Sequence, residues 1–461
     1  MALKIKIIVI WFPIYNQKLI TNRLMKKNLL VLSVVVLWSA LPMLAQEKST
    51  KAESIYRRSS LHTILLETGD FLNKDMVMKA YNMAPFPEKY NDHKLSGSVI
   101  SLNDYVQLTP EELAALSDTA AAAASDDKSK DSKREKLQTQ AIETYFQRNK
   151  IANQMVAKWF SRDENGAFKM DMIHERGSYD ATEMAAQMAQ KGIRGLASLK
   201  DAGEELISNT FIVVNKMSFV ENEPIARAVK EAAYIGAAYI KNSMVRQATE
   251  MAADAAYKIS KDGYSVWTIS YLYQLNWNED IANNFYMNMW MDSTSLDPNK
   301  KMMFDTTTMF TMKYVGFEKA KSVILVAIGK ETETIIQQAT VRNIDKTYTK
   351  LQKGFDVFKT KTPIYSTNPV VAKIGMKEGV EPNDKFEVLE MVFDAKAGVT
   401  KYAKVGEVKA EKGMIWDNRF NMGVPEAATT EEEVGKVELD GTHFKGGGKN
   451  VMSGMLLRQI K

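Results

Sequence analysis

Residues 264–277 read YSVWTISYLYQLNW, and large side chains occupy every second position of this stretch from Trp267 to Trp277. Thr268, Ser270 and Gln274 lie among the positions between them. A period of two predicts a β-strand with one buried face. Because an aromatic side chain can remove roughly 150 to 250 Å² from water, we expect this strand to anchor the core.

The sequence around this strand alternates between helical and extended patterns. Residues 278–291 fit both, but Asn278 as a cap with acidic residues after it favours a helix. Interleaved helices and strands predict, for residues 137–358, an α+β domain in which helices cover a mixed sheet. The other predicted helices are residues 137–159, 180–192, 195–208, 225–258 with a break near Gly236, and 334–351. The other predicted strands are residues 168–173, 211–214, 304–314 and 323–328.

The last hundred residues change character, because short strand patterns alternate there with turns rich in glycine, asparagine and aspartate. A closed sheet leaves no exposed edge, so residues 359–461 predict a small SH3-like β-barrel. The predicted strands are residues 370–374, 386–393, 401–409, 414–416 and 455–460, with a long loop at residues 422–449.

The part of the chain before the mixed sheet divides into two segments by composition. Residues 46–116 predict a helical and irregular segment, in which Pro85 and Pro87 interrupt a helix. Residues 117–136 contain five consecutive alanines followed by charged and serine residues, without a large apolar side chain. Nothing drives such a segment into a core, so we expect a linker or a frayed surface helix.

The start of the chain has the features of an export signal. Lys26 and Lys27 precede an apolar run at residues 29–44, and Ala45 is a small residue at the expected cleavage position. We therefore predict a signal peptide within residues 1–45 and a protein that is exported to the periplasm, to the outer membrane or to the outside of the cell. The sequence leaves open whether translation starts at Met1 or at Met25. After residue 44, no apolar run reaches the roughly 18 residues that a transmembrane helix needs.

The charge balance and the lack of cysteine exclude several function classes. Residues 1–45 carry six Lys or Arg and no Asp or Glu, so the rest has 55 basic against 56 acidic residues, a net charge near −1. This balance removes the main argument for nucleic-acid binding. The chain contains no cysteine, which excludes disulfides, thiolate metal sites, cysteine nucleophiles and a lipid-modified N-terminal cysteine.

Motifs that carry catalysis are incomplete. His174 and Glu175 begin like a zinc-protease helix, but Ser178 stands where the second histidine ligand belongs. Gly329 and Lys330 follow a strand pattern without the earlier glycine of a phosphate-binding loop. The four histidines of the chain are far apart in sequence. The sequence therefore predicts no catalytic residue, no metal site and no cofactor.

Two groups of residues are candidate ligand contacts. The first combines an aromatic ring with three polar side chains after a barrel strand, which fits a sugar, although the aromatic ring could instead close the barrel above a turn. The second is an arginine pair beside two serines, which fits a phosphate or carboxylate, or a solvated pair that pins an N-terminal segment. The candidates are Trp416, Asp417, Asn418 and Arg419 in the first group, and Arg57 and Arg58 in the second.

Parts of the chain resemble known envelope proteins. The residues that carry the likeness at the C-terminus are Ala372-Lys373-Ile374-Gly375, Glu378-Gly379-Val380, Asn383-Asp384 and Phe386-Glu387-Val388. They resemble the small C-terminal barrel of the flagellar assembly protein T family, and the middle region resembles the sheet-and-helix modules of that family and of curli-type secretion components. The N-terminal part, with Pro85-Phe86-Pro87, resembles an uncharacterised family of secreted bacterial envelope proteins. The resemblance implies an assembly role without catalytic residues.

These features favour a non-enzymatic exported cell-envelope protein that acts in assembly or as a binding or scaffold module, with other envelope proteins or glycan as partners. Two alternatives stay open. One is a secreted hydrolase with a carboxylate pair that includes Glu175 or Asp201. The other is a glycan-binding protein that uses the C-terminal barrel. The sequence predicts neither the identity of the partner nor the oligomeric state.

Overall fold

The structure is a computed structural model, and it describes residues 56–67, 73–97, 99–101, 128–177, 203–325, 332–394, 399–419 and 439–460. Ser54–Lys461 form one compact unit. The predicted signal peptide and residues 117–127 of the predicted linker lie outside the described residues.

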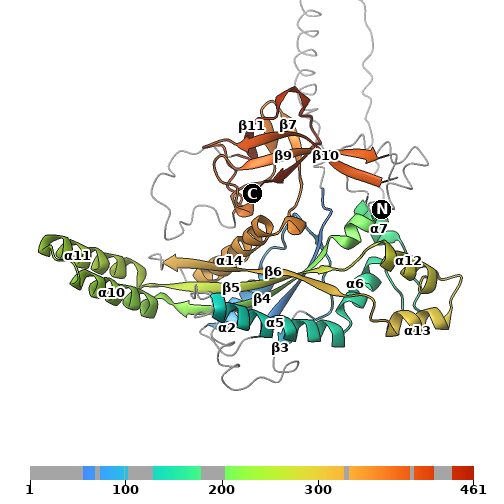
Figure 1. Cartoon of the computed structure of the whole chain (residues 1–461), viewed down its shortest axis with the longest axis horizontal. Helices are drawn as coiled ribbons and strands as arrows, with labels where there is room; N and C mark the ends of the chain where they lie inside the picture. Colours follow the sequence, from blue (N-terminus) through green and yellow to red (C-terminus); the bar gives the residue numbers. More distant parts are fainter. Residues whose placement is uncertain are drawn as a thin grey trace, which may run out of the picture. The chain divides into compact units, whose positions relative to one another are not determined.

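The larger sheet is mixed and has the strand order β2-β1-β4-β5-β6, with β3 paired to β1 off this path. β1 (Ser60–Glu67) runs parallel to β2 (Asn91–Asp92), β3 (Val99–Ser101) and β4 (Thr210–Glu221). β4, β5 (Gly263–Leu275) and β6 (Met312–Leu325) pair antiparallel (Figure 1). The sequence prediction of a strand that anchors the sheet is confirmed, because β5 lies between β4 and β6.

Helices cover both faces of this sheet. Ile269, Tyr271 and Tyr273 of β5 pack in one cluster with α5 (Lys128–Arg148), α6 (Ile151–Trp159) and α12 (Glu279–Asn288). Val266 and Leu272 pack on the other face against α14 (Thr332–Gly354). The prediction that β5 has one buried face is therefore wrong, because α14 provides a second apolar layer and also buries the polar positions of the strand.

Several local predictions hold and others fail for reasons of helix capping. α12 is confirmed, and the Asn278 side chain accepts a hydrogen bond from the Ile281 amide at 3.0 Å. The strand predicted at residues 168–173 is wrong, since α7 (Asp171–Gly177) occupies its second half. The strand predicted at residues 304–314 is right only at its end, since α13 (Pro298–Thr306) covers its start and β6 begins at Met312. The Asp297 side chain caps α13, and proline in its first turn suits a helix start. α2 (Lys74–Met83) lies in the N-terminal segment.

The helix predicted at residues 225–258 with a break near Gly236 is two helices, and the break lies at residues 239–242. α10 (Asn222–Ala238) and α11 (Ser243–Ser260) form a hairpin that connects β4 to β5 and extends beyond the ends of these strands (Figure 1). The chain reverses before Asn242, whose side chain accepts hydrogen bonds from the amides of Met244 and Val245 at 3.0 and 3.3 Å. An asparagine cap of this kind starts a new helix, and sequence periodicity alone does not reveal the reversal.

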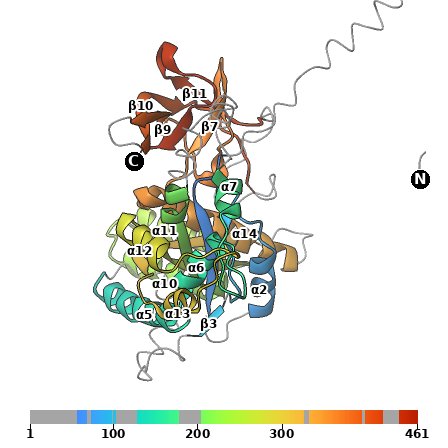
Figure 2. The same cartoon turned by 90° about the vertical axis from the view of Figure 1, so that its right-hand side faces the viewer.

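Six antiparallel strands close into a small barrel, as the sequence predicts (Figure 2). The predicted strand at residues 414–416 is wrong. β11 lies inside the predicted loop, and the sequence did not indicate it because its two short ladders pair with strands far away in sequence. The strands are β7 (Thr362–Thr367), β8 (Val370–Ala372), β9 (Lys385–Asp394), β10 (Val399–Ala410), β11 (Thr442–Gly446) and β12 (Leu456–Gln459).

Candidate functional site

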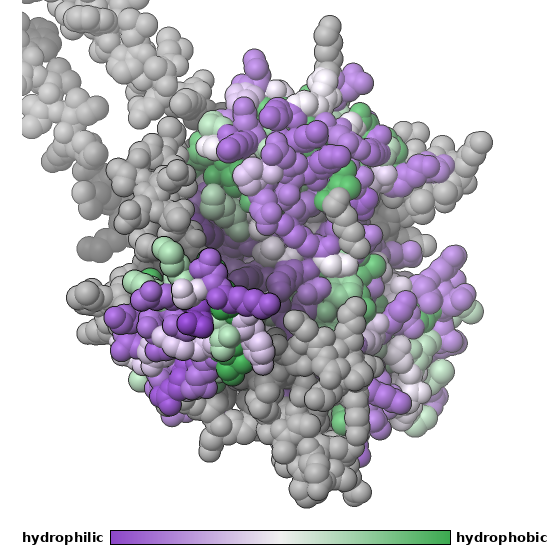
Figure 3. Space-filling view, turned by 60° about the vertical axis from the view of Figure 1, so that its left-hand side comes forward, coloured by the Kyte–Doolittle hydropathy of each residue, from purple (hydrophilic) through white to green (hydrophobic). Residues whose placement is uncertain are grey.

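The α10–α11 hairpin carries an exposed apolar face. Figure 3 brings this side of the molecule forward and shows a mainly hydrophilic surface in which hydrophobic side chains gather in small groups. On the hairpin the apolar residues recur at helical spacing, three or four positions apart, and α11 has no buried residue at all. We define the apolar face as Ile225, Ala228, Val229, Ala232, Ile235 and Tyr239 on and just after α10, with Met244, Ala248, Met251, Ala252, Ala255 and Ile259 on α11.

The large side chains of this face are open to water. Ile235 is 65% exposed, Tyr239 84% and Met244 80%. An apolar helical stripe normally packs against the core of its own domain. These stripes do not, so the fold of the described residues leaves them available.

Polar contacts between the two helices hold the hairpin together. The Lys230 ammonium lies 2.7 Å from a carboxylate oxygen of Asp254, and the Tyr234 hydroxyl donates to the other oxygen at 3.0 Å. The Tyr257 hydroxyl donates to Glu223 at 2.8 Å. Because a helix turns about 100° per residue, the apolar stripe of each helix lies on the side turned away from these contacts, and the two stripes line the outer sides of the hairpin.

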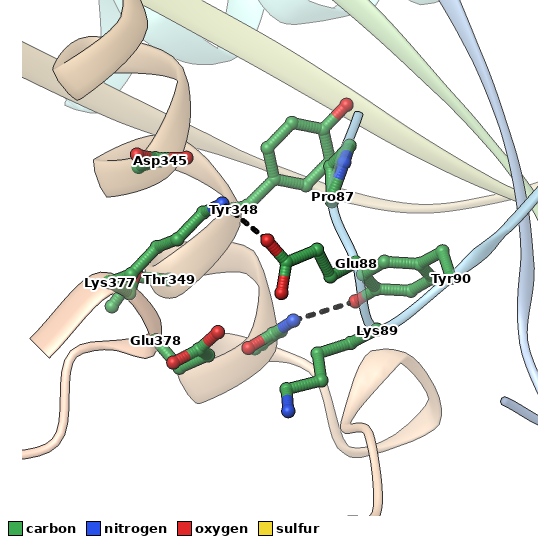
Figure 4. A pocket seen from close by; sticks show the side chains of 10 residues that line it. Pro87, Glu88, Lys89, Tyr90, Asp345, Tyr348, Thr349, Lys377 and Glu378 are labelled. Carbon is green, nitrogen blue, oxygen red and sulfur yellow. Dashed lines mark hydrogen bonds and ion pairs between the residues drawn. The ribbon is translucent and has the colours of Figure 1, made fainter. Parts of the chain in front are cut away.

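A small pocket with a volume of about 20 Å³ lies between the loop before β2, helix α14 and the short helix η3 (Met376–Glu378) at the barrel (Figure 4). Its charged side chains are largely paired. The Lys377 ammonium lies 4.0 Å from Glu88, and the Lys89 ammonium donates to the backbone carbonyl of Lys373. Glu378 accepts a hydrogen bond from the Gly375 amide at 2.8 Å.

Asp345 on α14 is the titratable group that stands out in this pocket. Burial raises the pKa of its carboxyl to about 6, and the nearby Lys377 offsets part of this effect. The surrounding contacts tie the walls together, since Thr349 donates to the Lys377 carbonyl at 2.9 Å and Gln352 donates to the Tyr90 hydroxyl at 2.9 Å. The pocket is therefore a polar joint between α14 and the barrel that holds one carboxyl with a pKa near neutrality.

The structure places two of the predicted ligand contacts beside this joint. The guanidinium of Arg57 donates to the Glu88 carbonyl at 2.6 Å. The Asn418 side chain accepts from the Lys377 amide at 2.8 Å and donates to Glu378 at 2.9 Å. The segment around Arg57 and the segment around Asn418 thus contact residues that line the same pocket.

The other predicted contacts lie apart from the pocket and bond within the fold. Arg419 and Asp417 form a two-pronged ion pair with distances of 2.8 and 2.6 Å. The Trp416 amide donates to the Thr442 hydroxyl at 3.1 Å. Arg58 is buried, and its guanidinium donates to the Gly177 carbonyl at 3.1 Å. Contacts of this kind position the loop and the N-terminal segment.

A polar network that the sequence analysis did not identify links the barrel to the residues before β4. The Tyr402 hydroxyl on β10 donates to both carboxylate oxygens of Glu205 at 2.7 and 2.9 Å, and Lys361 lies 3.4 Å from the same carboxylate. Burial raises the pKa of the Tyr402 hydroxyl and lowers that of the Lys361 ammonium. Residues 205 and 402 are far apart in the chain, so no local pattern signals this contact.

The incomplete histidine motif lies on α7, where His174 and Glu175 are exposed. Its third residue, Arg176, is buried and donates to the Ser60 hydroxyl at 2.9 Å and the Asp92 carbonyl at 2.8 Å. Asp201 lies outside the described residues. Among the residues that are described, no group of three or more His, Asp or Glu side chains could hold a metal ion.

Comparison with known proteins adds no family. The chain matches no protein-family model, and no curated protein matches it. Within the described ranges, no helix is long and apolar enough to cross a membrane.

Proposed function

We propose that the protein is a non-enzymatic binding or scaffold module of the cell envelope, and that the α10–α11 hairpin is the element that binds its partner. The observation that carries this proposal is the apolar face, whose large exposed side chains form a stripe on the outer side of each helix. Exposed apolar surface marks interaction sites on soluble proteins. A helical hairpin held together by polar contacts between its helices can present these stripes without support from the core.

The pocket supports the same proposal, because its charged groups serve the joint between α14 and the barrel. The Lys377 ammonium and the Glu88 carboxylate lie near each other, and Glu378 binds backbone and Asn418. Rigid attachment of the barrel suits a scaffold. We also propose that the barrel is an SH3-like module, a proposal that its closed ring of six antiparallel strands supports.

Export is part of this proposal. Its support is the basic and apolar segment within residues 1–45. N-terminal sequencing of the protein purified from its own cells tests it. We expect a first residue near Gln46, and a cytosolic product that retains residues 25–45 would contradict export.

Site-specific photo-crosslinking in intact cells tests the role of the hairpin. A photoreactive residue at position 235 lies on the apolar face, and one at the exposed Gln247 lies on the charged flank of α11. We expect a discrete crosslinked adduct from position 235 and none from position 247. Equal labelling at both positions, or no adduct at position 235, would overturn the proposal.

A further inference from the structure

We infer that His62 and His93 form an acid-sensitive latch: when both rings take up a proton, α7 and the segment that follows β2 detach from β1 and α6. This inference concerns a different part of the molecule from the α10–α11 hairpin and does not depend on the proposed role of the hairpin. It rests on the hydrogen bonds of the two rings, on the charges around them and on the contacts that hold α7 in place.

The hydrogen bonds of His93 require a neutral ring. His93 follows β2 and is fully buried, and the guanidinium of Arg176 on α7 lies 3.1 Å from its Nδ1 atom. A guanidinium can only donate, so Nδ1 accepts and carries no proton. The other ring nitrogen, Nε2, lies 3.1 Å from the backbone carbonyl oxygen of Met155 on α6, which can only accept. The proton of the neutral ring is therefore on Nε2, and a second proton on Nδ1 would face the guanidinium.

His62 of β1 is held in the same way. Its ring is fully buried, and its Nδ1 atom accepts a hydrogen bond from the Leu95 amide at 3.3 Å. A backbone amide cannot accept, so protonation of Nδ1 breaks this bond as well. The two histidines thus fasten both ends of the short segment from His93 to Leu95, one end to α6 and α7 and the other end to β1.

The surroundings of the two rings oppose their protonation. Burial lowers the pKa of His93 well below its usual value, and nearby cations lower it further. Burial also lowers the pKa of His62, to about 4. The charged groups that face the rings are the cations Arg176 of α7, Lys158 of α6 and Lys94, and the carboxylate of Asp92, which favours a proton on His62. Each ring therefore stays neutral while α7 is in place.

Acid consequently favours the opened form. The pKa of both rings is lower in the closed form than the 6.5 of an unperturbed histidine. The stability that the neutral rings contribute is therefore fully present above about pH 6.5, and it is lost as the pH falls from 6.5 towards the pKa of the closed form. For each pH unit in this range, each histidine raises the ratio of opened to closed form about tenfold. Two histidines released together raise it about a hundredfold.

The contacts of Arg176 make α7 the element that this protonation releases. Besides its bond to His93, the guanidinium donates to the Ser60 hydroxyl of β1 at 2.9 Å and to the Asp92 carbonyl of β2 at 2.8 Å. It also lies 4.7 Å from the centre of the Trp159 ring of α6, which stacks on His93 at 5.0 Å. Movement of Arg176 away from a charged His93 therefore breaks contacts of α7 with β1, β2 and α6 together.

The opening is local to this corner of the mixed sheet. Release of α7 uncovers Trp159 and Ile173, which are now buried together in one cluster. The barrel and α14 pack in separate clusters. Acid also acts with the opposite sign at the pocket, because burial raises the pKa of Asp345 and its protonated carboxyl favours the folded state. Acid thus opens the protein at α7 and tightens it at α14.

Hydrogen–deuterium exchange of the purified full chain at pH 7.5 and 5.0 tests the inference. After correction for the intrinsic pH dependence of exchange, the ratio of opened to closed form at α7 should rise about 1,000-fold between these values. This is the product of about 30-fold for each histidine over about 1.5 pH units below 6.5. Strand β9 of the barrel serves as the internal reference and should show no such rise.

His62→Gln and His93→Gln are the matched variants, because glutamine keeps a donor and an acceptor but takes up no proton in this range. Each should reduce the response to about 30-fold, and the double variant should abolish it. His174→Gln changes an exposed histidine of α7 and should leave the full response. Circular dichroism at pH 7.5 checks that the variants fold.

Equal protection of α7 at both pH values in the natural protein would overturn the inference, and so would a double variant that keeps the full response. If the double variant does not fold, nuclear magnetic resonance of the natural protein decides. We expect both buried rings to carry their proton on Nε2 at pH 7.5 and to stay neutral until α7 opens. A His93 ring that becomes charged while α7 remains protected would show that the ring does not hold the helix.

Discussion

Helix α14 and the α10–α11 hairpin are both amphipathic, and they use their apolar residues in opposite ways. α14 buries twelve residues against the sheet, polar ones such as Thr340 and Asn343 among them. α11 buries none, although its apolar stripe is as regular. Packing within the fold thus explains the apolar residues of α14, whereas no packing among the described residues explains the apolar stripes of the hairpin. Each prediction below tests whether this contrast holds.

The largest difference should appear in the free energy of unfolding. Leu351 of α14 is fully buried, so Leu351→Ala should cost about 3 kcal/mol through lost burial and the remaining cavity. Met251→Ala on α11 should change the free energy by less than about 0.5 kcal/mol, measured on monomer by dilution. Urea unfolding at a fixed low protein concentration measures both. Similar losses in the two variants would mean that the hairpin packs on its own domain.

Asp345 on α14 should lower stability at neutral pH. Its folded pKa is raised from 3.8 to about 6, so the folded state binds the proton more tightly than the unfolded state. The stability that the protonated Asp345 carboxyl contributes is therefore fully present below about pH 4, and it is lost as the pH rises through 6. Asp345→Asn removes the charge without a change of size, and it should stabilise the protein by about 2 kcal/mol at pH 7.5.

Urea unfolding of both proteins at pH 4.5 and 7.5 checks this sign. The difference between them should be small at pH 4.5 and large at pH 7.5. A constant difference would show that the carboxyl does not titrate between these values.

Removal of the hairpin should leave the domain folded. Glu221 of β4 pairs with Tyr264 of β5, so an Asn-Gly turn can join the two strands in place of residues 222–263. We expect a loss of about 1 kcal/mol, since the hydrogen bond from Ser265 to Asn222 disappears with the hairpin. Circular dichroism and urea unfolding measure the fold and the stability of the shortened chain. A shortened chain that fails to fold would show that the hairpin belongs to the core.

How far the sequence predicts this molecule depends on how local the decisive contacts are. β5 and α12 could be predicted, because a regular alternation and a capping residue lie within the segments themselves. β11 could not, since its short ladders with β8 and β10 come from distant parts of the chain. The network around Glu205 was missed for the same reason.

The candidate sites show the same limit. Arg57 and Asn418 were picked out as ligand contacts, and their proximity to one pocket arises only through Glu88 and Lys377. The apolar face was missed because periodicity predicts that a helix has an apolar side, but it does not tell whether the domain covers that side. Only the structure shows that α14 and the sheet pack against each other without the hairpin.

The smallest effect is expected at the glycine within α10. Gly236→Ala should raise the stability of the protein by about 0.5 kcal/mol, because alanine favours the helix and the added methyl group meets no neighbour. Urea unfolding at low protein concentration measures this effect. A loss of stability would show that another part of the protein packs against Gly236, and the contrast between α14 and the hairpin would then fail at this residue.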